Sequence, residues 1–216
     1  MSDNNHMSLN KDIIKISSAL SGIFAGFILL LIYFFFRRLI EILPIPFARY
    51  ICLIPYILLV YSVFKIENVE DSKINKSISR MKFFSISSLF LSPFWTWWHS
   101  AIDNDYLFIN MILFVLCTLF FLINLSSYLV NLSSSLGAVY ACIFAKFARY
   151  GIIYIMMAPF IAVCMVLLYG QGDGNVFINI LINTNKWFFK VIFSPFPLLM
   201  ISLIFLIYQI KWRLLN

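Results

Sequence analysis

The chain contains little charge. Charged residues make up 12% of its 216 residues and only nine side chains are acidic, whereas soluble domains contain about 25% charged residues. Hydrophobic residues make up 62%. A water-soluble fold cannot hide that much apolar surface, but a lipid bilayer accepts it. The scarcity of charge therefore excludes a soluble domain and predicts an integral membrane protein.

Cysteine and histidine are too few and too scattered for a metal site or a disulfide framework. The cysteines Cys52, Cys117, Cys142 and Cys164 all lie in apolar segments without paired spacing, which is typical of small packing residues. We therefore expect no metal and no cofactor. The net charge of +7 does not indicate nucleic-acid binding, because the basic residues flank the apolar blocks, where they meet lipid headgroups.

Six apolar blocks alternate with short polar stretches. A helix needs about 20 mostly apolar residues to cross a bilayer, so the predicted fold is all-α, a polytopic bundle of about six transmembrane helices. Five or seven spans are alternatives, because the third block is short and contains Pro93 and because residues 128–145 could cross as well. The predicted spans are residues 17–36, 47–64, 83–98, 106–130, 150–169 and 190–208, within a single transmembrane domain of residues 17–210.

The segments outside these blocks are short. Residues 1–16 form a polar tail, residues 65–82 an inner loop and residues 211–216 a basic tail. The apolar residues of the inner loop recur at intervals of three to five, so it is either a solvated connector or an amphipathic helix on the membrane surface. The first block is expected to stay as an anchor, because two arginines follow it instead of a small-residue cleavage site.

Lysine and arginine counts orient the six spans, because basic residues in short loops stay on the cytoplasmic side. With the N-terminus inside, eleven basic residues fall on the inner side and five on the outer side. We therefore expect both termini in the cytoplasm. Abundant Ile, Phe, Asn and Lys indicate an AT-rich genome, and the expected location is a bacterial cytoplasmic membrane. The inner residues are Lys11, Lys15, Lys65, Lys73, Lys76, Arg80, Lys82, Lys146, Arg149, Lys211 and Arg213, and the outer ones are Arg37, Arg38, Arg49, Lys186 and Lys190.

Polar residues recur along the fourth block. Asn110, Cys117, Asn124 and Asn131 are spaced by seven, which keeps them on one face of a supercoiled helix. Asparagine amides in hydrocarbon need partners, so this face is expected to point into the bundle. It is either an interhelical hydrogen-bonding seam or one wall of a polar pathway.

Small residues and prolines mark helix packing. Ser18, Gly22 and Gly26 repeat every four residues, and small residues at that spacing let another helix approach closely. Prolines inside a helix remove a backbone hydrogen bond and introduce kinks. Kinks are therefore predicted at Pro93, Pro159 and Pro195.

The densest cluster of chemical groups follows the third block. Trp97, Trp98, His99, Asp103 and Asp105 lie within nine residues. One histidine and two carboxylates could form an acid–base or metal pair. An aromatic belt at the membrane interface followed by a solvated turn is the simpler interpretation.

Two short pieces recur at nearly the same offset. Residues 47–50 and 147–150 both read Phe-Ala-Arg-Tyr, and residues 92–94 and 194–196 both read Ser-Pro-Phe. A real repeat would give two inverted three-span halves, which is the architecture of many secondary transporters. Matches this short also arise by chance in a chain of biased composition.

Two strings resemble those of intramembrane proteases. Residues 170–173 read Gly-Gln-Gly-Asp, which resembles the aspartyl proteases, but that chemistry needs a second aspartate and no apolar block contains one. Residues 135–141 resemble the active helix of rhomboid proteases, yet leucine occupies the nucleophile's position and no histidine follows.

The sequence thus predicts a membrane protein without enzymatic activity. Its expected role is a scaffold or assembly component, with the lipid bilayer, other membrane proteins or a second copy of itself as partners and no nucleic acid. The alternatives are a small transporter or channel, in which Asn110, Asn124, Pro93 and Pro195 converge on a cavity, and an interfacial enzyme that uses His99 and Asp103.

Overall fold

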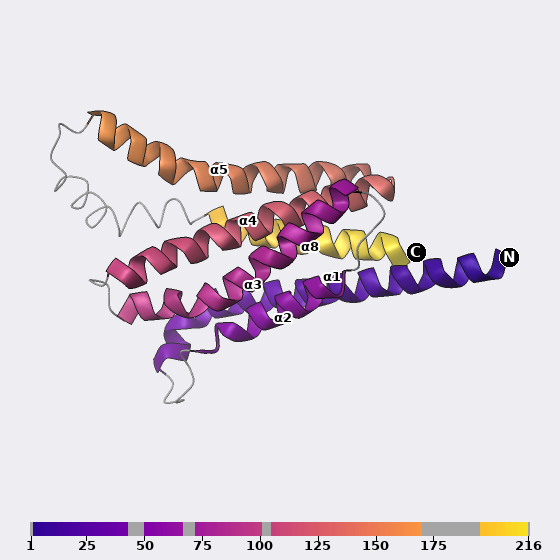
Figure 1. Ribbon diagram of the computed structural model, residues 1–216, viewed down its shortest axis with the longest axis horizontal. Coiled ribbons are helices and arrows are strands. Elements are labelled where there is room, and N and C mark those ends of the chain that lie inside the picture. The colour runs from indigo at the N-terminus through magenta and orange to yellow at the C-terminus, as the bar shows by residue number, and fades with distance from the viewer. Residues whose placement is uncertain (1, 43–49, 67–71, 101–104, 170–194, 216) are drawn as a thin grey trace.

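The protein is all-helical in the residues that the structure describes. This computed structural model describes residues 2–42, 50–66, 72–100, 105–169 and 195–215. They form six helices and no strand (Figure 1), so the predicted all-α class is confirmed for this part of the chain. The helices are α1 (Ser2–Ile42), α2 (Leu53–Phe64), α3 (Ser72–Ser100), α4 (Asp105–Ser135), α5 (Val139–Tyr169) and α8 (Pro195–Leu215).

Each predicted span falls on one of these helices, but the bounds differ. The helices α1, α3, α4 and α5 are longer than the predicted spans, because helical structure continues into the polar flanks. Residues 72–82, assigned to a loop from the sequence, belong to α3, where Ile78 and Met81 are fully buried. Part of the second and sixth predicted spans, residues 47–49 and 190–194, lies outside the described residues.

The α4–α5 turn answers the question of an extra span at residues 128–145. The helix α4 ends at Ser135, and Gly137 follows with a φ of +64°. The Ala138 N–H donates to the Ser133 carbonyl at 2.9 Å and the Gly137 N–H to the Ser134 carbonyl at 3.1 Å, which is the Schellman pattern of a helix end. Residues 128–145 therefore contain a turn between two helices.

The helices form a closed ring, and neighbours in the ring run antiparallel. Each helix contacts the next one along the chain, and α8 contacts α5 and also α1, which closes the ring. On α1 and α2, Gly22 faces Ser62 while Gly26 faces Leu59, so residue numbers rise along one helix as they fall along the other. Figure 1 shows the N- and C-termini at the same end of the bundle.

Two described helices contain a segment long and apolar enough to cross a membrane. These segments are Ile13–Tyr33 in α1 and Ile109–Ser135 in α4. The shorter apolar helix α2 (Leu53–Phe64) packs against α1 and α3. The core of the ring is made of fully buried aliphatic and aromatic side chains, among them Leu20, Ile23, Phe27, Leu122, Leu125, Leu129, Leu203 and Ile207.

Candidate functional site: a hydroxyl and thiol cluster between α2, α3 and α4

The helix α3 buries a stripe of hydroxyl side chains. Ser85, Ser88, Ser92 and Thr96 follow one another at intervals of three or four residues, which places them on one face of the helix. None of the four is more than 4% exposed. This face packs against α2 and α4, so the hydroxyls lie at the contact of three helices.

Three of these hydroxyls are bound to their own helix. The Oγ atoms of Ser85 and Ser92 donate to the carbonyl oxygens of Lys82 at 2.8 Å and Leu89 at 2.9 Å. Thr96 donates to the carbonyl of Pro93 at 2.9 Å. The buried donors are therefore satisfied, as buried polar groups in folded proteins almost always are.

Contacts from the neighbouring helices complete the cluster. The Sγ atom of Cys52, just before α2, lies 3.9 Å from Thr96 Oγ1 and 4.0 Å from the Ser92 carbonyl oxygen. On α4, Thr118 Oγ1 donates to Ser88 Oγ at 3.4 Å and is also hydrogen-bonded to the Tyr56 hydroxyl of α2. We define the hydroxyl cluster as Cys52, Tyr56, Ser88, Ser92, Thr96 and Thr118.

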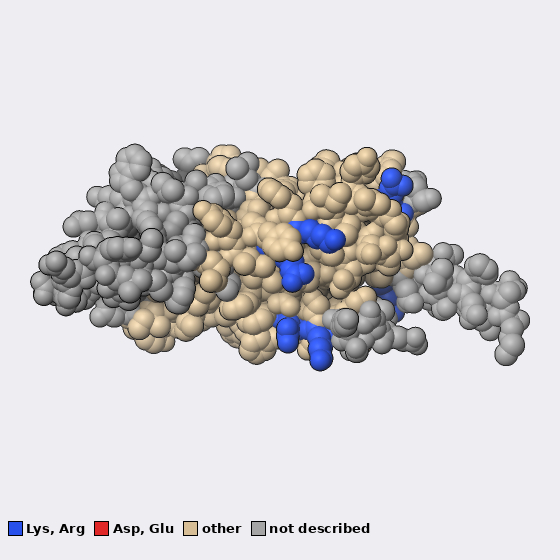
Figure 2. All heavy atoms as spheres, turned by 90° about the horizontal axis from the view of Figure 1, so that it is seen from above, with Lys and Arg blue, Asp and Glu red and all other residues tan. Residues whose placement is uncertain are grey.

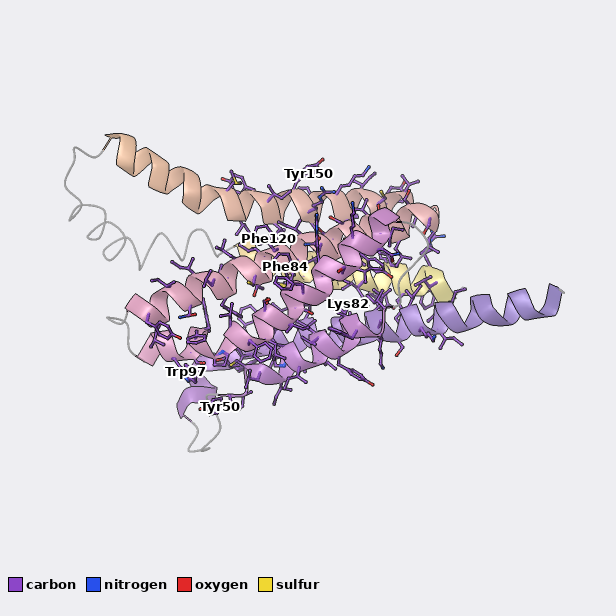
Figure 3. The ribbon with its side chains drawn as sticks, viewed as in Figure 1. Tyr50, Lys82, Phe84, Trp97, Phe120 and Tyr150 are labelled. Carbon is purple, nitrogen blue, oxygen red and sulfur yellow. The ribbon has the colours of Figure 1, made fainter. Side chains whose placement is uncertain are left out.

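Aromatic rings enclose the same contact. The ring centroids of Tyr56 and Phe114 are 5.5 Å apart and meet edge to face, and Trp95 lies 6.2 Å from Phe114. Closer to the termini, Phe84 of α3 stacks on Phe120 of α4 at 5.1 Å (Figure 3). The cluster is therefore a polar region inside an otherwise apolar interface.

The members of the cluster are alcohols, a phenol and a thiol, which are uncharged at pH 7 at their ordinary pKa values. Hydrogen bonds within a protein contribute about 0.5–1.5 kcal/mol each to its stability. The hydrogen bonds of the hydroxyl cluster hold α2 against α3, and α3 against α4, in a fixed register. Among the described residues, no three His, Cys, Asp or Glu side chains gather into a possible metal site.

Two asparagines of α4, Asn110 and Asn124, bind carbonyl groups of their own helix. The amide nitrogen of Asn110 donates to the Tyr106 carbonyl at 2.8 Å, and that of Asn124 donates to the Phe120 carbonyl at 2.7 Å. Asn131 and Cys117 are half-buried. The contact across helices at this level comes instead from Ser77, whose hydroxyl donates to the backbone carbonyl of Asn124 at 3.0 Å.

The small residues of α1 lie against α2. A Cβ atom added to Gly26 would lie 2.7 Å from Leu59 Cδ2, and one added to Gly22 would overlap the side chain of Ser62. Ser18 lies at the end of this contact and accepts a 3.4 Å hydrogen bond from Lys65 Nζ. These three residues thus face the neighbouring helix of the same chain.

The tryptophan-rich cluster lies at the end of the bundle away from the termini (Figure 3). Trp97, Trp98 and His99 belong to the last turn of α3, and Asp105 begins α4. The ring of Phe94 lies 5.3 Å from Trp97 and 6.0 Å from Tyr106. Asp103 lies outside the described residues, as does the Gly-Gln-Gly-Asp string at 170–173.

The prolines and the recurring pieces occupy unlike positions. Pro93 lies inside α3, whereas Pro195 is the first residue of α8, where a missing N–H costs no helical bond. The helix α5 continues through Pro159 to Tyr169 and bends in its C-terminal part (Figure 1). Residues 147–150 lie inside α5, but 47–49 and Ser194 lie outside the described residues.

Sequence reasoning missed the hydroxyl cluster although a signal was present. Serine and threonine at positions 85, 88, 92 and 96 follow the same helical spacing that drew attention to the asparagines. The asparagines were noticed because their amides are strongly polar, whereas serines are common and weakly polar.

Comparison with protein-family models, curated proteins and solved structures finds no match.

Proposed function

We propose that the protein is a polytopic integral membrane protein with six spanning helices and a non-enzymatic role in membrane assembly. One observation carries the membrane part of this proposal. The helix α5 turns Ala141, Ala145 and Ala148 inward, where each is at most 4% exposed. It turns its large aromatic side chains outward, and Tyr140, Phe147, Tyr150 and Tyr154 are 68–78% exposed, whereas Ile152 and Ile155 are buried farther along the helix.

An exposed face of large aromatic side chains beside a buried face of alanines is not the pattern expected in water. A soluble helix buries its large apolar side chains, because the gain on burial grows with the apolar area removed from water. In a bilayer, small residues favour close helix contact and large ones face the lipid tails. Tyr150 points away from the bundle in Figure 3. The other helices also expose large apolar side chains, including Phe35, Ile57, Phe90, Leu113 and Phe205.

The charge distribution supports the same proposal and a cytoplasmic location of the termini. Every charged side chain that the structure describes is basic, and all lie on the parts of the helices nearer the termini. Figure 2 shows the described Lys and Arg side chains of the face drawn, from the middle of the molecule toward the end that holds the termini. Basic residues concentrate on the cytoplasmic side of membrane proteins. The described basic residues are Lys15, Lys65, Lys76, Arg80, Lys82, Lys146, Arg149, Lys211 and Arg213.

The buried polar groups support a structural role, because they form contacts between the helices of the bundle. The hydroxyl cluster joins α2, α3 and α4, while Gly22 and Gly26 join α1 to α2. These groups contribute contacts between helices. The bundle then presents a rigid outer surface to other membrane proteins.

A transporter of two inverted halves has less support. Pro93 and Pro195 would have to occupy equivalent positions in the two halves, yet one lies inside a helix and the other begins one. The amide nitrogens of Asn110 and Asn124 both bind carbonyls of their own helix. Neither pair of residues favours a shared cavity.

Labelling of single cysteines in intact cells tests the six-span topology. In a variant without native cysteines, Asp103→Cys should react with a membrane-impermeant maleimide, and Ser135→Cys should react only after permeabilisation. If residues 83–98 do not cross the membrane, both results reverse. Labelling of both positions from the same side would contradict either topology. Extraction of the protein by alkaline carbonate would contradict membrane insertion itself.

Purification in a mild detergent tests the assembly role. We expect the tagged chain to elute with a second membrane protein in a constant ratio, and deletion of the chain to lower the steady-state amount of that protein. A monodisperse monomer with robust catalytic turnover, and no change in any membrane protein on deletion, would contradict the proposal.

A further inference from the structure

The outward side of α5 carries one continuous stripe of large side chains. Their positions advance in steps of three and four residues, which keeps them on one face of the helix over about five turns. Each of them is at least 40% exposed on the bundle. In a membrane this face meets either lipid tails or another protein. We define the α5 stripe as Tyr140, Ile143, Phe147, Tyr150, Tyr154 and Met157.

Two tyrosines of the α5 stripe lie far from the ends of the helix. Tyr154 is the middle residue of Val139–Tyr169, so it lies about 22 Å from each end at 1.5 Å per residue. Tyr150 lies one helical turn nearer to the start of α5. A hydrocarbon core about 30 Å thick that is centred on this helix contains both phenol groups.

The other exposed tyrosines that the structure describes stand near helix ends. Each of them precedes a helix or lies within seven residues of the end of one. Tyrosine is ordinary there, because aromatic rings with a polar atom collect at the headgroup level of a bilayer. The depth of Tyr150 and Tyr154 is therefore the exception. The tyrosines near helix ends are Tyr50, Tyr61, Tyr106, Tyr140 and Tyr208.

Within the part of the chain that the structure describes, neither Tyr150 nor Tyr154 makes a hydrogen bond. Their side chains are 68% and 71% exposed, and Figure 3 shows Tyr150 directed out of the bundle. A hydroxyl group in hydrocarbon is costly without a hydrogen-bond partner, and tyrosines removed from water usually have one. Lipid tails offer no such partner, whereas a neighbouring protein does.

A second copy of the chain supplies matching groups at the matching depth. A phenol both donates and accepts a hydrogen bond, so the same tyrosine from two copies forms a complementary pair. Two copies inserted in the same orientation and related by a two-fold axis along the membrane normal bring equal residues to equal depth. Tyr150 and Tyr154 of one copy then face the same residues of the other. The steps of three and four residues along the α5 stripe are those of helices that interlock in pairs.

The basic residues of α5 do not oppose this contact. At about 100° per residue, Lys146 and Arg149 lie about 70° and 130° from the centre of the α5 stripe, on the same flank. Two-fold symmetry places these flanks on opposite sides of the contact, so the like charges of the two copies stay apart. The other flank carries Phe144, which packs on Phe205 of α8.

We propose that two copies of the chain form a parallel, two-fold symmetric dimer in the membrane through the α5 stripe. The proposal rests on the membrane insertion proposed above and names a partner for the assembly role. Tyr150 and Tyr154 hydrogen-bond across the contact, and Phe147 and Met157 contribute apolar surface to it. The position of the phenols within the hydrocarbon core makes the contact specific, because lipid tails cannot replace the hydrogen bonds.

Energy transfer between two labelled populations tests the dimer with the full chain. Copies that carry a donor or an acceptor dye at the C-terminus are reconstituted together in dioleoyl-phosphatidylcholine vesicles and diluted with the same lipid. The wild type should show more transfer than random encounters produce. Tyr150→Phe/Tyr154→Phe removes only the two hydroxyls and should raise the protein-to-lipid ratio at half-association about 5–30-fold.

Tyr61→Phe/Tyr208→Phe is the matched control, because it removes two phenol hydroxyls from exposed tyrosines near helix ends. This variant should associate like the wild type. Thermal unfolding of detergent-dispersed monomers should be the same for all three chains, which excludes misfolding as the cause of a weaker association. Equal shifts in both double variants, or only random transfer in the wild type, would overturn the inference.

Disulfide cross-linking locates the contact on the bundle. In a variant without native cysteines, Phe147→Cys should give a cross-linked dimer on mild oxidation in the vesicles. Phe90→Cys replaces a 74% exposed residue of α3 and should remain monomeric. Cross-linking of Phe90→Cys without cross-linking of Phe147→Cys would overturn the assignment of the contact to α5.

A different occupant of the α5 stripe would also be visible. If Phe147→Cys in native membranes cross-links only to a chain of another mass, while purified copies stay separate in vesicles, the second copy is refuted as the partner. A chain that resists carbonate extraction but stays monomeric would refute only this inference, whereas extraction by carbonate would refute membrane insertion.

Discussion

The Ser92 hydroxyl donates a 2.9 Å hydrogen bond to the carbonyl oxygen of Leu89. In a regular helix this carbonyl accepts from the N–H of residue 93, but residue 93 is a proline and has none. Ser92 therefore supplies the donor that Pro93 removes. Side chains that satisfy freed carbonyls are one way in which membrane helices tolerate an internal proline. The helix α3 accordingly continues through Pro93 to Ser100.

This relationship predicts coupling between Ser92 and Pro93. Ser92→Ala leaves a buried carbonyl unsatisfied and should lower the free energy of unfolding by about 1–3 kcal/mol. In a Pro93→Ala background the restored N–H binds the Leu89 carbonyl, so the same change should cost much less. Thermal unfolding in detergent micelles measures both.

Ser87→Ala provides the control for that cycle. Ser87 Oγ also binds a carbonyl of its own helix, that of Phe83 at 3.1 Å. The Phe83 carbonyl keeps its regular helical donor, so this change should have little effect in either background. A Ser92→Ala loss of equal size with and without Pro93 would show that the hydroxyl does not compensate for the proline.

A second prediction concerns the turn between α4 and α5. Gly137 has a φ of +64°, and an added Cβ would meet no atom within 4 Å. Gly137→Ala should therefore cost about 1–2 kcal/mol through backbone strain alone, because L residues other than Asn and Asp rarely adopt this conformation. Gly137→Asn should cost less than Gly137→Ala. If both substitutions are neutral in thermal unfolding, the Schellman turn does not form in the folded protein.

A third prediction concerns the contact of α1 with α2. A Cβ atom at Gly22 would overlap the Ser62 hydroxyl and lie 2.9 Å from Ser62 Cβ, but 3.9 Å from Ser62 Cα. Gly22→Ala should destabilise the protein by about 1–3 kcal/mol through overpacking. Adding Ser62→Gly removes both close atoms, so the double variant should be more stable than the sum of the two single changes.

The measurement for this pair is again thermal unfolding, with the four variants compared in the same detergent. A simple sum of the single effects would mean that the two helices do not meet at these residues. The Ser62 hydroxyl also donates to the Leu58 carbonyl at 2.6 Å. Ser62→Gly alone therefore has a cost, which the comparison of the four variants subtracts.

Helix content was predictable from the sequence because several of its apolar runs have the length and composition of membrane-crossing helices. Helix bounds were harder to predict. Residues 65–82 carry Lys76, Arg80 and Lys82 and were predicted to be a solvated connector or an amphipathic surface helix. Residues 72–82 belong to α3, in which Ile78 and Met81 are fully buried. The turn at Gly137 was hard to predict because the residues before it are weakly polar serines, which also occur inside helices. Local helix propensity predicts the ends of a helix poorly where tertiary packing decides whether a segment is helical.

The candidate site was less predictable than the fold. Asn110 and Asn124 were correctly noticed as polar, but sequence does not say whether an amide binds its own helix or another one. Cys52 and Thr96 lie more than forty positions apart in the sequence. Their proximity depends on the pairing of α2 with α3, which only the folded chain reveals.

The exposed aromatic face of α5 leads to the last prediction. Ala145 is fully buried, while Tyr154 is 71% exposed. If α5 faces lipid with its large side chains, Tyr154→Leu should change stability by less than about 0.5 kcal/mol, as surface changes usually do. Ala145→Leu adds volume inside the bundle and should destabilise by about 1–3 kcal/mol. Thermal unfolding in detergent, with Ala145→Gly as the size control, distinguishes the two positions. A large loss from Tyr154→Leu together with a tolerated Ala145→Leu would mean that α5 is rotated about its axis and that its aromatic face is the buried one.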